Sequence, residues 1–486
     1  MAPLSDMEYG LKPGPISKIF LTSILSLISF CCFGTDKEVD FDRATQEIRK
    51  IISTAIEKDT TNPPGNESKV TSFIATILKK KGIPVEEIEF APGRKNLMAR
   101  FSGTSKTLRP LILLAHLDVV GSDFQNWTMP AHHMTEKDGY LYGRGVYDDL
   151  LMAAANTEML VLLKEEHFKS PRDIVVLLTG DEESGGQGLE NLLKKKPDLE
   201  KAALVVNEGG GPAMNENGVV NWATIQVHEK IYQDFSIVAK GDPGHSSRIN
   251  SKNALVKLVH ALDQVSQISF SYKLPAEMKT YFEEKSKVEK AGISKALKDI
   301  LTSSSKNLPE SALKTLREHR PGYLAHLTST CAPVLMSGGF RANALPAEAR
   351  ATINCRLLPD ENIEEVRKKM VALIHDEDVT VTAEKEMGPS VPSPMDGKAI
   401  ALIRQNIVEF WPQAVVVPTM QLGMTDSRYF RAKGIPAYGL NPFPMKDADL
   451  MHTHGADERI PISSLRPGVE FYYRLVKALA LGLESP

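Results

Sequence analysis

The chain has 486 residues, of which 42% are hydrophobic and 24% are charged, and its formal net charge is −3. This composition is typical of a folded globular protein, and the length predicts more than one domain because one hydrophobic core rarely serves so long a chain. The sequence has no long block of lysine and arginine. It therefore argues against a nucleic-acid or anionic-membrane partner.

Residues 1–34 form a distinct N-terminal segment. Lys12 and Lys18 precede the apolar run IFLTSILSLISFCCF at 19–33, and Gly34 follows it. A positive flank, a short apolar run and a small residue at its end are typical of a secretory signal peptide. We therefore expect a secreted or periplasmic protein. The alternatives are an uncleaved N-terminal membrane anchor, for which the run is short, and a buried helix of the fold.

The segment 40–226 alternates between helical and strand-like patterns. Its strands are nearly continuous apolar runs, which indicate a mostly parallel sheet covered on both faces. The fold class is therefore α/β. Helices are predicted at 41–58, 67–82, 148–168 and 188–197, and strands at 96–103, 110–121, 173–180 and 202–211.

The pattern changes near residue 227. Alternating strand patterns and two helices predict a small α+β domain inserted at 227–388, and a polar, helical stretch lies within it at 272–325. The α/β pattern resumes at 389–486. We expect 40–226 and 389–486 to form one catalytic domain that the insertion splits in sequence.

Histidine and acidic side chains follow three of the predicted strands. His116 and Asp118 come after LILLA. Glu182 and Glu183 come after IVVLLTG, and Glu208 comes after ALVVN. Because the carboxyl ends of parallel strands meet at one edge of a sheet, we expect these side chains to converge.

Two further pairs belong to the same candidate site. Asp148 and Asp149 precede a predicted helix, where a capping role accounts for only one aspartate. His452 and His454 lie in the loop MHTHGADER, and either one alone would be an ordinary surface histidine. Imidazole and carboxylate ligands without cysteine suit Zn²⁺, Mn²⁺ or Co²⁺. Such a large set favours two ions that share a bridging carboxylate.

Nine motifs follow one another along nearly the whole chain after residue 40. They are HLD (116–118), GRGVYDD (143–149), GDEESGG (180–186), NEGGG (207–211), GHSS (244–247), GGFRANALP (338–346), CRLLP (355–359), GMTDSR (423–428) and HGADE (454–458). In this order the sequence resembles the M20 family of metallopeptidases and aminoacylases. The resemblance implies a zinc-peptidase-like catalytic domain and a ferredoxin-like inserted lid domain.

The resemblance also implies a set of metal ligands. His116 and Glu208 would bind one zinc ion, Glu183 and His454 the other, and Asp148 would bridge the two. The cofactors are therefore expected to be two Zn²⁺, with Mn²⁺ or Co²⁺ as alternatives.

Three more residues receive catalytic roles from the resemblance. Asp118 would accept a hydrogen bond from His116 and fix its tautomer. Glu182 would be the general base that takes a proton from the metal-activated water and delivers it to the leaving amine. His245 would stabilise the oxyanion; in this family it comes from the partner subunit or arrives by domain closure.

Four residues are implied to hold the substrate: Asn343, Arg356, Gly423 and Thr425. Arg356 suits a carboxylate because its guanidinium group can donate two parallel hydrogen bonds. The expected substrate is a small peptide or an N-acyl amino acid, and a homodimer through the lid domain is a further expectation.

We expect a zinc-dependent carboxypeptidase or dipeptidase that acts near a free carboxylate. The alternative within the family is an N-acyl-amino-acid amidohydrolase. The complete ligand set and Glu182 argue against a non-catalytic binding descendant of the fold. The motif GHSS lacks the pattern around a serine nucleophile, which argues against a serine hydrolase.

Three positions depart from the family pattern. Leu150 and Leu151 stand where Lys-Gly often follows the paired aspartates, Asn354 stands where aspartate is frequent, and Met424 replaces a small residue. None of these changes removes a predicted ligand, so activity is still expected while substrate preference is less certain.

Cys331 and Cys355 are the two cysteines that remain if the N-terminal segment is removed. They lie on either side of a predicted hairpin turn and would face each other across it. In an exported protein they would form a disulfide or remain two buried thiols.

Overall fold

The structure is a computed structural model that describes residues 39–123, 125–304, 307–385 and 391–483. The predicted signal peptide or anchor at 1–34 lies outside these residues. Within the described ranges, no helix is both long enough and apolar enough to cross a membrane.

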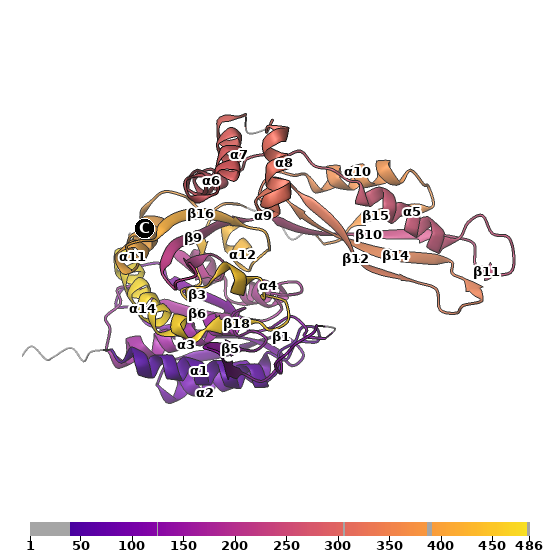
Figure 1. The fold of residues 1–486 in the computed structure, drawn as a ribbon. Helices are drawn as coiled ribbons and strands as arrows, with labels where there is room; N and C mark the ends of the chain where they lie inside the picture. The colour runs from indigo at the N-terminus through magenta and orange to yellow at the C-terminus, as the bar shows by residue number, and fades with distance from the viewer. Residues whose placement is uncertain (1–38, 124, 305–306, 386–390, 484–486) are drawn as a thin grey trace, which may run out of the picture. The chain divides into compact units, whose positions relative to one another are not determined.

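A nine-stranded sheet forms the centre of the fold (Figure 1), in the order β1-β2-β6-β3-β7-β17-β9-β16, with β8 paired to β9. The middle strands β6, β3, β7 and β17 run parallel, whereas β1 and β2 add antiparallel strands at one edge. This arrangement confirms the predicted α/β class. The strands are β1 Val85–Ala91, β2 Arg94–Phe101, β3 Leu111–His116, β6 Ile174–Thr179, β7 Leu204–Asn207, β8 Gly211–Met214, β9 Val220–Glu229, β16 Val415–Gln421 and β17 Ala437–Gly439.

Both faces of this sheet are covered, which explains the unbroken apolar runs. Along β3, Leu111 and Leu113 pack into one hydrophobic core, and Ile112 and Leu114 pack into another on the opposite face. Successive side chains of a strand point to opposite faces, so a strand with a core on each side must be apolar throughout. The first face is covered by α1 Phe41–Glu57, α2 Ser68–Lys80, α3 Leu150–Glu165, α11 Lys398–Phe410 and α14 Leu465–Gly482, and the second by α4 Gln187–Lys195 and α12 Ser427–Arg431.

A second sheet has four antiparallel strands in the order β12-β14-β10-β15. Along β10, Phe235, Ile237 and Ala239 are buried and alternate with partly exposed residues, as expected for a sheet with one packed face. Two helices cover that face. These elements are β10 Ile231–Lys240, β12 Thr330–Gly338, β14 Glu348–Leu357, β15 Val379–Ala383, α5 Ala254–Ser266 and α10 Ile363–Ile374.

Four helices follow α5 in the chain and form a core of their own. That core includes Met278 of α6 and Met420 of β16, so α6 packs on the edge strand of the central sheet. The domain boundaries 40–226, 227–388 and 389–486 stay a prediction, although part of the predicted insertion lies against the central sheet. The helices are α6 Ala276–Val288, α7 Ala291–Thr302, α8 Glu310–His319 and α9 Pro321–Ala325.

Short elements complete the described chain. Two small sheets pair β11 with β13 and order three strands as β18-β5-β4. They are β4 Thr135–Lys137, β5 Tyr140–Tyr142, β11 Gly244–His245, β13 Ala344–Leu345 and β18 Arg459–Pro461, and a short helix α13 spans Asp447–Leu450.

Cys331 and Cys355 form a disulfide. They are directly opposite each other in β12 and β14, and their Cα atoms are 4.0 Å apart. The disulfide is therefore the alternative that the structure adopts.

Candidate metal centre

The candidate site lies at the carboxyl ends of the parallel strands. His116 is the last residue of β3. Glu182 and Glu183 come shortly after β6, and Glu208 comes directly after β7. Since β6, β3 and β7 are neighbours in the sheet, their ends bring these side chains together as expected.

Asp148 occupies the middle of the cluster. Its Oδ1 lies 3.0 Å from His116 Nε2, and its Oδ2 lies 3.0 Å from His454 Nε2. His454 Nε2 is also 3.2 Å from Glu183 Oε1, and His116 Nε2 is 3.7 Å from Glu208 Oε1. The structure thus gathers all five predicted ligands in the predicted pairs, with one oxygen of Asp148 facing each histidine.

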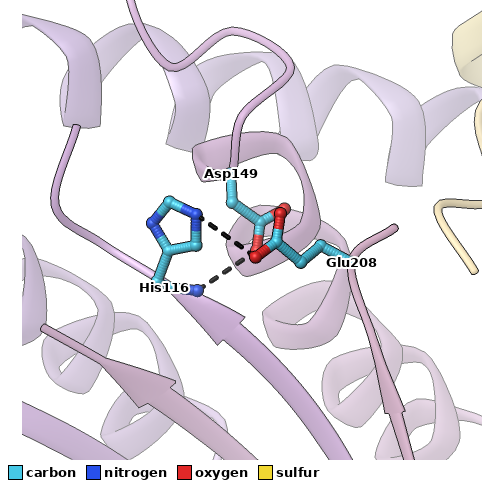
Figure 2. Close-up of side chains that lie close together, drawn as sticks. All are labelled: His116, Asp149 and Glu208. Atoms are coloured by element: carbon cyan, nitrogen blue, oxygen red, sulfur yellow. Dashed lines mark hydrogen bonds and ion pairs between the residues drawn. The ribbon is translucent and has the colours of Figure 1, made fainter. Parts of the chain in front are cut away.

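Asp149 belongs to the same cluster (Figure 2). Its carboxylate lies beside His116 and Glu208, and its Oδ2 accepts a hydrogen bond of 3.1 Å from the main-chain N–H of His116. Asp149 occupies the N-cap position of α3, but its side chain makes no capping hydrogen bond. The sequence places Asp149 in the candidate site without a defined role, and the second aspartate that capping leaves unexplained is the signal for one.

The donor atoms of the cluster fit a metal ion. His116, Asp149 and Glu208 form one group whose ligand atoms all lie within 4.8 Å of one another, and His116, Asp148 and Glu183 form another. Asp149 Oδ1 is buried and has no hydrogen-bond partner among the described residues. Buried carboxylate oxygens need a cation or a donor, and this nitrogen and oxygen set suits Zn²⁺, Mn²⁺ or Co²⁺.

The electrostatics of the two histidines agree with that fit. Burial lowers the pKa of His116, but the charge of Glu208 and the hydrogen bond to Asp148 outweigh burial and hold the pKa well above its usual value. Hydrogen bonds from His454 to Asp148 and Glu183 raise the pKa of His454 to about 11. The cluster therefore attracts positive charge, which a metal ion or protons can supply.

Asp118 acts differently from the prediction. His116 Nδ1 lies 2.9 Å from the main-chain oxygen of Asp118 and 3.7 Å from its carboxylate, so the ring N–H donates to the main chain. The carboxylate instead accepts hydrogen bonds of 3.1 Å from the main-chain N–H groups of Glu182 and Glu183. Asp118 thus orients the acidic loop after β6 with its side chain and His116 with its backbone.

Glu182 is buried at the wall of the cluster but belongs to neither ligand group. Burial raises its pKa well above the usual value, and the neighbouring charges of Glu183 and Asp426 act in the same direction. Its Oε1 has no hydrogen-bond partner among the described residues. A carboxylate with a raised pKa and an uncommitted oxygen is suited to accept and release a proton.

Asp181 holds the acidic loop in place, a role that sequence reasoning missed. Its carboxylate accepts hydrogen bonds from Asn62 Nδ2 at 3.1 Å, Arg94 Nη1 at 3.0 Å and the main-chain N–H of Gln187 at 3.1 Å. Asn62 Nδ2 also donates to Asp118, at 2.8 Å. The carboxylate therefore ties the residue before Glu182 to two distant parts of the chain.

Glu458 holds the loop that carries Asp148. It is buried, its Oε2 lies 2.6 Å from Arg144 Nη1, and its Oε1 accepts hydrogen bonds from the main-chain N–H groups of Tyr147 and Asp148. Arg144 and Glu458 belong to two of the motifs in the sequence. The opposite charges of Arg144 and Glu458 could have indicated from the sequence that GRGVYDD and HGADE lie side by side in the fold.

A cavity of about 600 Å³ opens on the cluster. Arg356 lines it together with Glu182, Gly423 and Thr425, so three of the four predicted substrate residues lie beside the predicted base. The Arg356 guanidinium stacks 4.5 Å from the Tyr232 ring centroid, which fixes its direction.

Glu229 holds the Gly423–Thr425 loop in place through hydrogen bonds. The main-chain N–H and the hydroxyl of Thr425 both donate to Glu229 Oε2, at 3.0 Å and 2.8 Å. Glu229 is in turn paired with Arg431 at 2.6 Å. Met424 lines the cavity, as its replacement of a small residue predicts.

His245 and Asn343 do not line the cavity that contains Arg356 and Glu182. His245 lies in β11, which pairs with β13, and Asn343 directly precedes β13. His245 is exposed, with Ser247 Oγ as its side-chain partner at 2.8 Å. Their roles, and the homodimer through the lid domain, stay predictions.

Comparison with known proteins identifies the family. A model of Peptidase family M20/M25/M40 matches residues 112–478. The chain belongs to this family. It is 26% identical over 385 residues to human N-fatty-acyl-amino acid synthase/hydrolase PM20D1, covering 77% of this chain and 75% of that protein.

Two further proteins extend the comparison. Probable carboxypeptidase S-like 2 of Dictyostelium discoideum is 27% identical over 390 residues, covering 79% of this chain and 74% of that protein. The crystal structure of the M20 family metallo-carboxypeptidase Sso-CP2 from Sulfolobus solfataricus superposes with a TM-score of 0.70 at 17% identity, covering 90% of this chain and 99% of that one. The predicted family and hydrolase class are thereby confirmed.

Proposed function

We propose that this M20 protein is a two-zinc hydrolase that cleaves the amide bond of a dipeptide, a peptide C-terminus or an N-acyl amino acid next to a free carboxylate. One observation carries the proposal: Arg356 and Glu182 line the same cavity as the carboxylate cluster. A substrate carboxylate paired with Arg356 would bring the neighbouring amide bond to the cluster and the base.

The ligand residues divide into two sets that share Asp148. His116 and Glu208 would hold one ion, and Glu183 and His454 the other. Asp149 lies close enough to His116 and Glu208 to join the first set. When bound, zinc ions supply Lewis-acid polarisation of a carbonyl group and lower the pKa of water.

The protein's own residues supply positioning and proton transfer. Arg356 orients the substrate carboxylate through its guanidinium group. Glu182 takes a proton from the attacking water and passes it to the leaving amine, so that one carboxylate serves both transfers. Asp118 and Asp181 keep Glu182 in place through hydrogen bonds to its own N–H group and the adjoining loop.

The relatives support both branches of the proposal. One is named an N-fatty-acyl-amino acid synthase/hydrolase and the other a probable carboxypeptidase S-like protein. Both reaction types cleave an amide bond beside an amino acid that carries a free carboxylate.

Replacing Glu182 by glutamine tests the proposal. The zinc-loaded protein is expected to hydrolyse N-acyl amino acids or dipeptides and to discriminate against their C-terminal amides. Because general-base catalysis is lost, Glu182→Gln should lower kcat by about 10²- to 10⁴-fold while the zinc content stays unchanged. Activity is measured by amine release and zinc content by elemental analysis.

Glu183→Gln is the matched control, since it changes the adjacent carboxylate and is expected to lower the zinc content. Retention of more than about a tenth of the activity in Glu182→Gln refutes its role as the base. A zinc-loaded wild-type protein that hydrolyses none of these substrates refutes the proposed function.

A further inference from the structure

A second cavity of about 420 Å³ opens on the same cluster. Asp148 and Glu208 line both this cavity and the one that contains Arg356. A substrate whose amide bond lies at the cluster and whose carboxylate reaches Arg356 therefore has a place for its other end. On the proposed function, that end is the acyl group.

The wall of this second cavity is built by α6 and the central sheet. Tyr281 of α6 meets Trp222 of β9 edge to face, with ring centroids 5.9 Å apart. Met420, Leu422 and Met445 add further apolar surface to the wall. Such a lining suits the methylene groups of an acyl chain.

Two basic side chains line this cavity, Lys285 and His326. Of the two, only Lys285 is cationic near neutral pH, because burial lowers the pKa of His326 to about 4. The Nζ of Lys285 lies 4.0 Å from the Trp222 ring centroid and 5.7 Å from that of Tyr281. Among the described residues, none forms an ion pair or a hydrogen bond with the Lys285 ammonium group, which lies against the two rings. Burial lowers its pKa, although the more distant charges of Asp447 and Glu289 oppose this effect.

The nearby acids do not neutralise this ammonium group. Glu289 is engaged by Arg320 at 3.0 Å and by the Tyr323 hydroxyl at 2.7 Å. Asp447 lines the cavity without reaching ion-pair distance of Lys285. An anion that entered the cavity would therefore find a partly buried cation with no paired carboxylate.

His326 does not compete for that anion near neutral pH. Burial lowers its pKa to about 4, and the charge of Lys230 acts in the same direction. Its ring packs 6.0 Å from that of Tyr281, and its Nδ1 has no hydrogen-bond partner among the described residues. It therefore adds a neutral polar group beside the aromatic wall.

We propose that this cavity binds the acyl group of the substrate and that Lys285 selects acyl groups with a carboxylate at their far end. The preferred substrate is then an N-acyl amino acid made from a dicarboxylic acid: its amino-acid carboxylate meets Arg356 and its acyl carboxylate meets Lys285. This inference rests on the proposed function for the placement of the amide bond. Hydrolysis releases the dicarboxylic acid and the free amino acid.

Matched pairs of N-acyl amino acids test Lys285. The N-succinyl, N-adipoyl and N-suberoyl derivatives of one amino acid are compared with the N-butyryl, N-hexanoyl and N-octanoyl derivatives of equal chain length. At one or more lengths, the wild-type kcat/KM is expected to favour the diacid derivative by about tenfold or more. Lys285→Met should remove this preference by slowing only the diacid substrates, and Lys285→Arg should retain it.

Lys287→Met is the control variant. Lys287 lies on the same helix, is mostly exposed and pairs with Glu284, so its loss should leave the preference unchanged. Thermal unfolding of each variant checks that it is folded.

A binding measurement separates this inference from the proposed function. Calorimetric titration with free adipate and hexanoate should give about tenfold tighter binding of adipate to the wild type and equal binding to Lys285→Met. If neither N-acyl amino acids nor dipeptides are hydrolysed, the proposed function fails and this titration alone decides the role of Lys285. The inference is overturned if diacid and monoacid derivatives have equal kcat/KM at every chain length. It is also overturned if Lys285→Met keeps the full wild-type preference for the diacid.

Discussion

Two departures from the family pattern have local explanations at the scale of single residues. Asn354 donates from Nδ2 to Asp234 at 2.8 Å and accepts from Arg356 Nε at 3.2 Å. An aspartate at this position would place a second carboxylate against Asp234, whereas the amide links the acid to the arginine. Leu150 and Leu151 are buried in the core at the start of α3, where a lysine would be costly.

Glu158 is a buried acid on α3 whose ionisation should limit stability at high pH. Burial raises its pKa from 4.5 to about 8, although Arg43 lies 3.3 Å away. The folded state therefore holds the proton more tightly than the unfolded state, and stability falls as the pH rises from 4.5 through about 8. Glu158→Gln should remove a pH-dependent loss on the order of 3 kcal/mol in unfolding free energy.

Denaturant unfolding at about pH 5 and pH 9 measures this difference on either side of the titration. Glu166→Gln, a more exposed change at the C-cap of the same helix that pairs with Lys477, is the control and should keep the wild-type pH dependence. The same fall in stability for Glu158→Gln and wild type contradicts the prediction.

At the scale of elements, buried carboxylates fix the loops that carry the site. Asp118 receives two main-chain N–H groups from the loop after β6, and Glu458 receives three from the loop before α3. Each loop is thus held by an acid from another element. Such charge-assisted hydrogen bonds keep several carboxylates close together before any cation is bound.

The disulfide between Cys331 and Cys355 is expected to stabilise the second sheet. It joins neighbouring strands across a separation of 24 residues. Removing a disulfide that closes a loop of this size typically lowers the free energy of unfolding by about 3 kcal/mol. The double variant Cys331→Ala, Cys355→Ala should unfold at a lower denaturant concentration while its zinc content stays unchanged. Reductant should lower the wild-type midpoint and leave the double variant unaffected. A wild-type midpoint that is insensitive to reductant contradicts this prediction.

At the scale of the whole molecule, the cluster joins parts of the chain that are far apart in sequence. His116, Asp148, Glu183, Glu208 and His454 come from five separate segments. A metal ion among them would bind the folded chain and have few ligands in the unfolded one. Binding energy at this site would therefore appear directly as folding stability.

Removal of metal by a chelator should lower the thermal midpoint of the protein. At a free-metal concentration about 100 times the dissociation constant, binding contributes about 2.7 kcal/mol. The shift should reverse when Zn²⁺ is restored and should be smaller in Glu183→Gln, which lacks one ligand. A midpoint that the chelator does not lower and added Zn²⁺ does not raise would show that the cluster binds no zinc.

The sequence by itself determined the α/β class, the family and the meeting of five candidate ligands. Apolar strands covered on both faces have a clear pattern, and the ends of parallel strands share one edge of the sheet, which brings His116, Glu183 and Glu208 together. The resemblance of the motifs to the M20 family supplied the family and the ligand roles of Asp148 and His454. The cleavable N-terminal segment, the domain boundaries and the roles of His245 and Asn343 stay predictions.

Only the tertiary structure decided what holds and surrounds those ligands. Asp149, Asp181 and Glu458 all accept hydrogen bonds from main-chain N–H groups, which nearly every residue offers, so these contacts leave no pattern in a sequence. Lys285 and Trp222 meet because α6 packs on the central sheet, although a run of polar helical residues gave no sign of it. Periodicity fixes which face of an element is buried, but the partner of that face is set by packing across the folded chain.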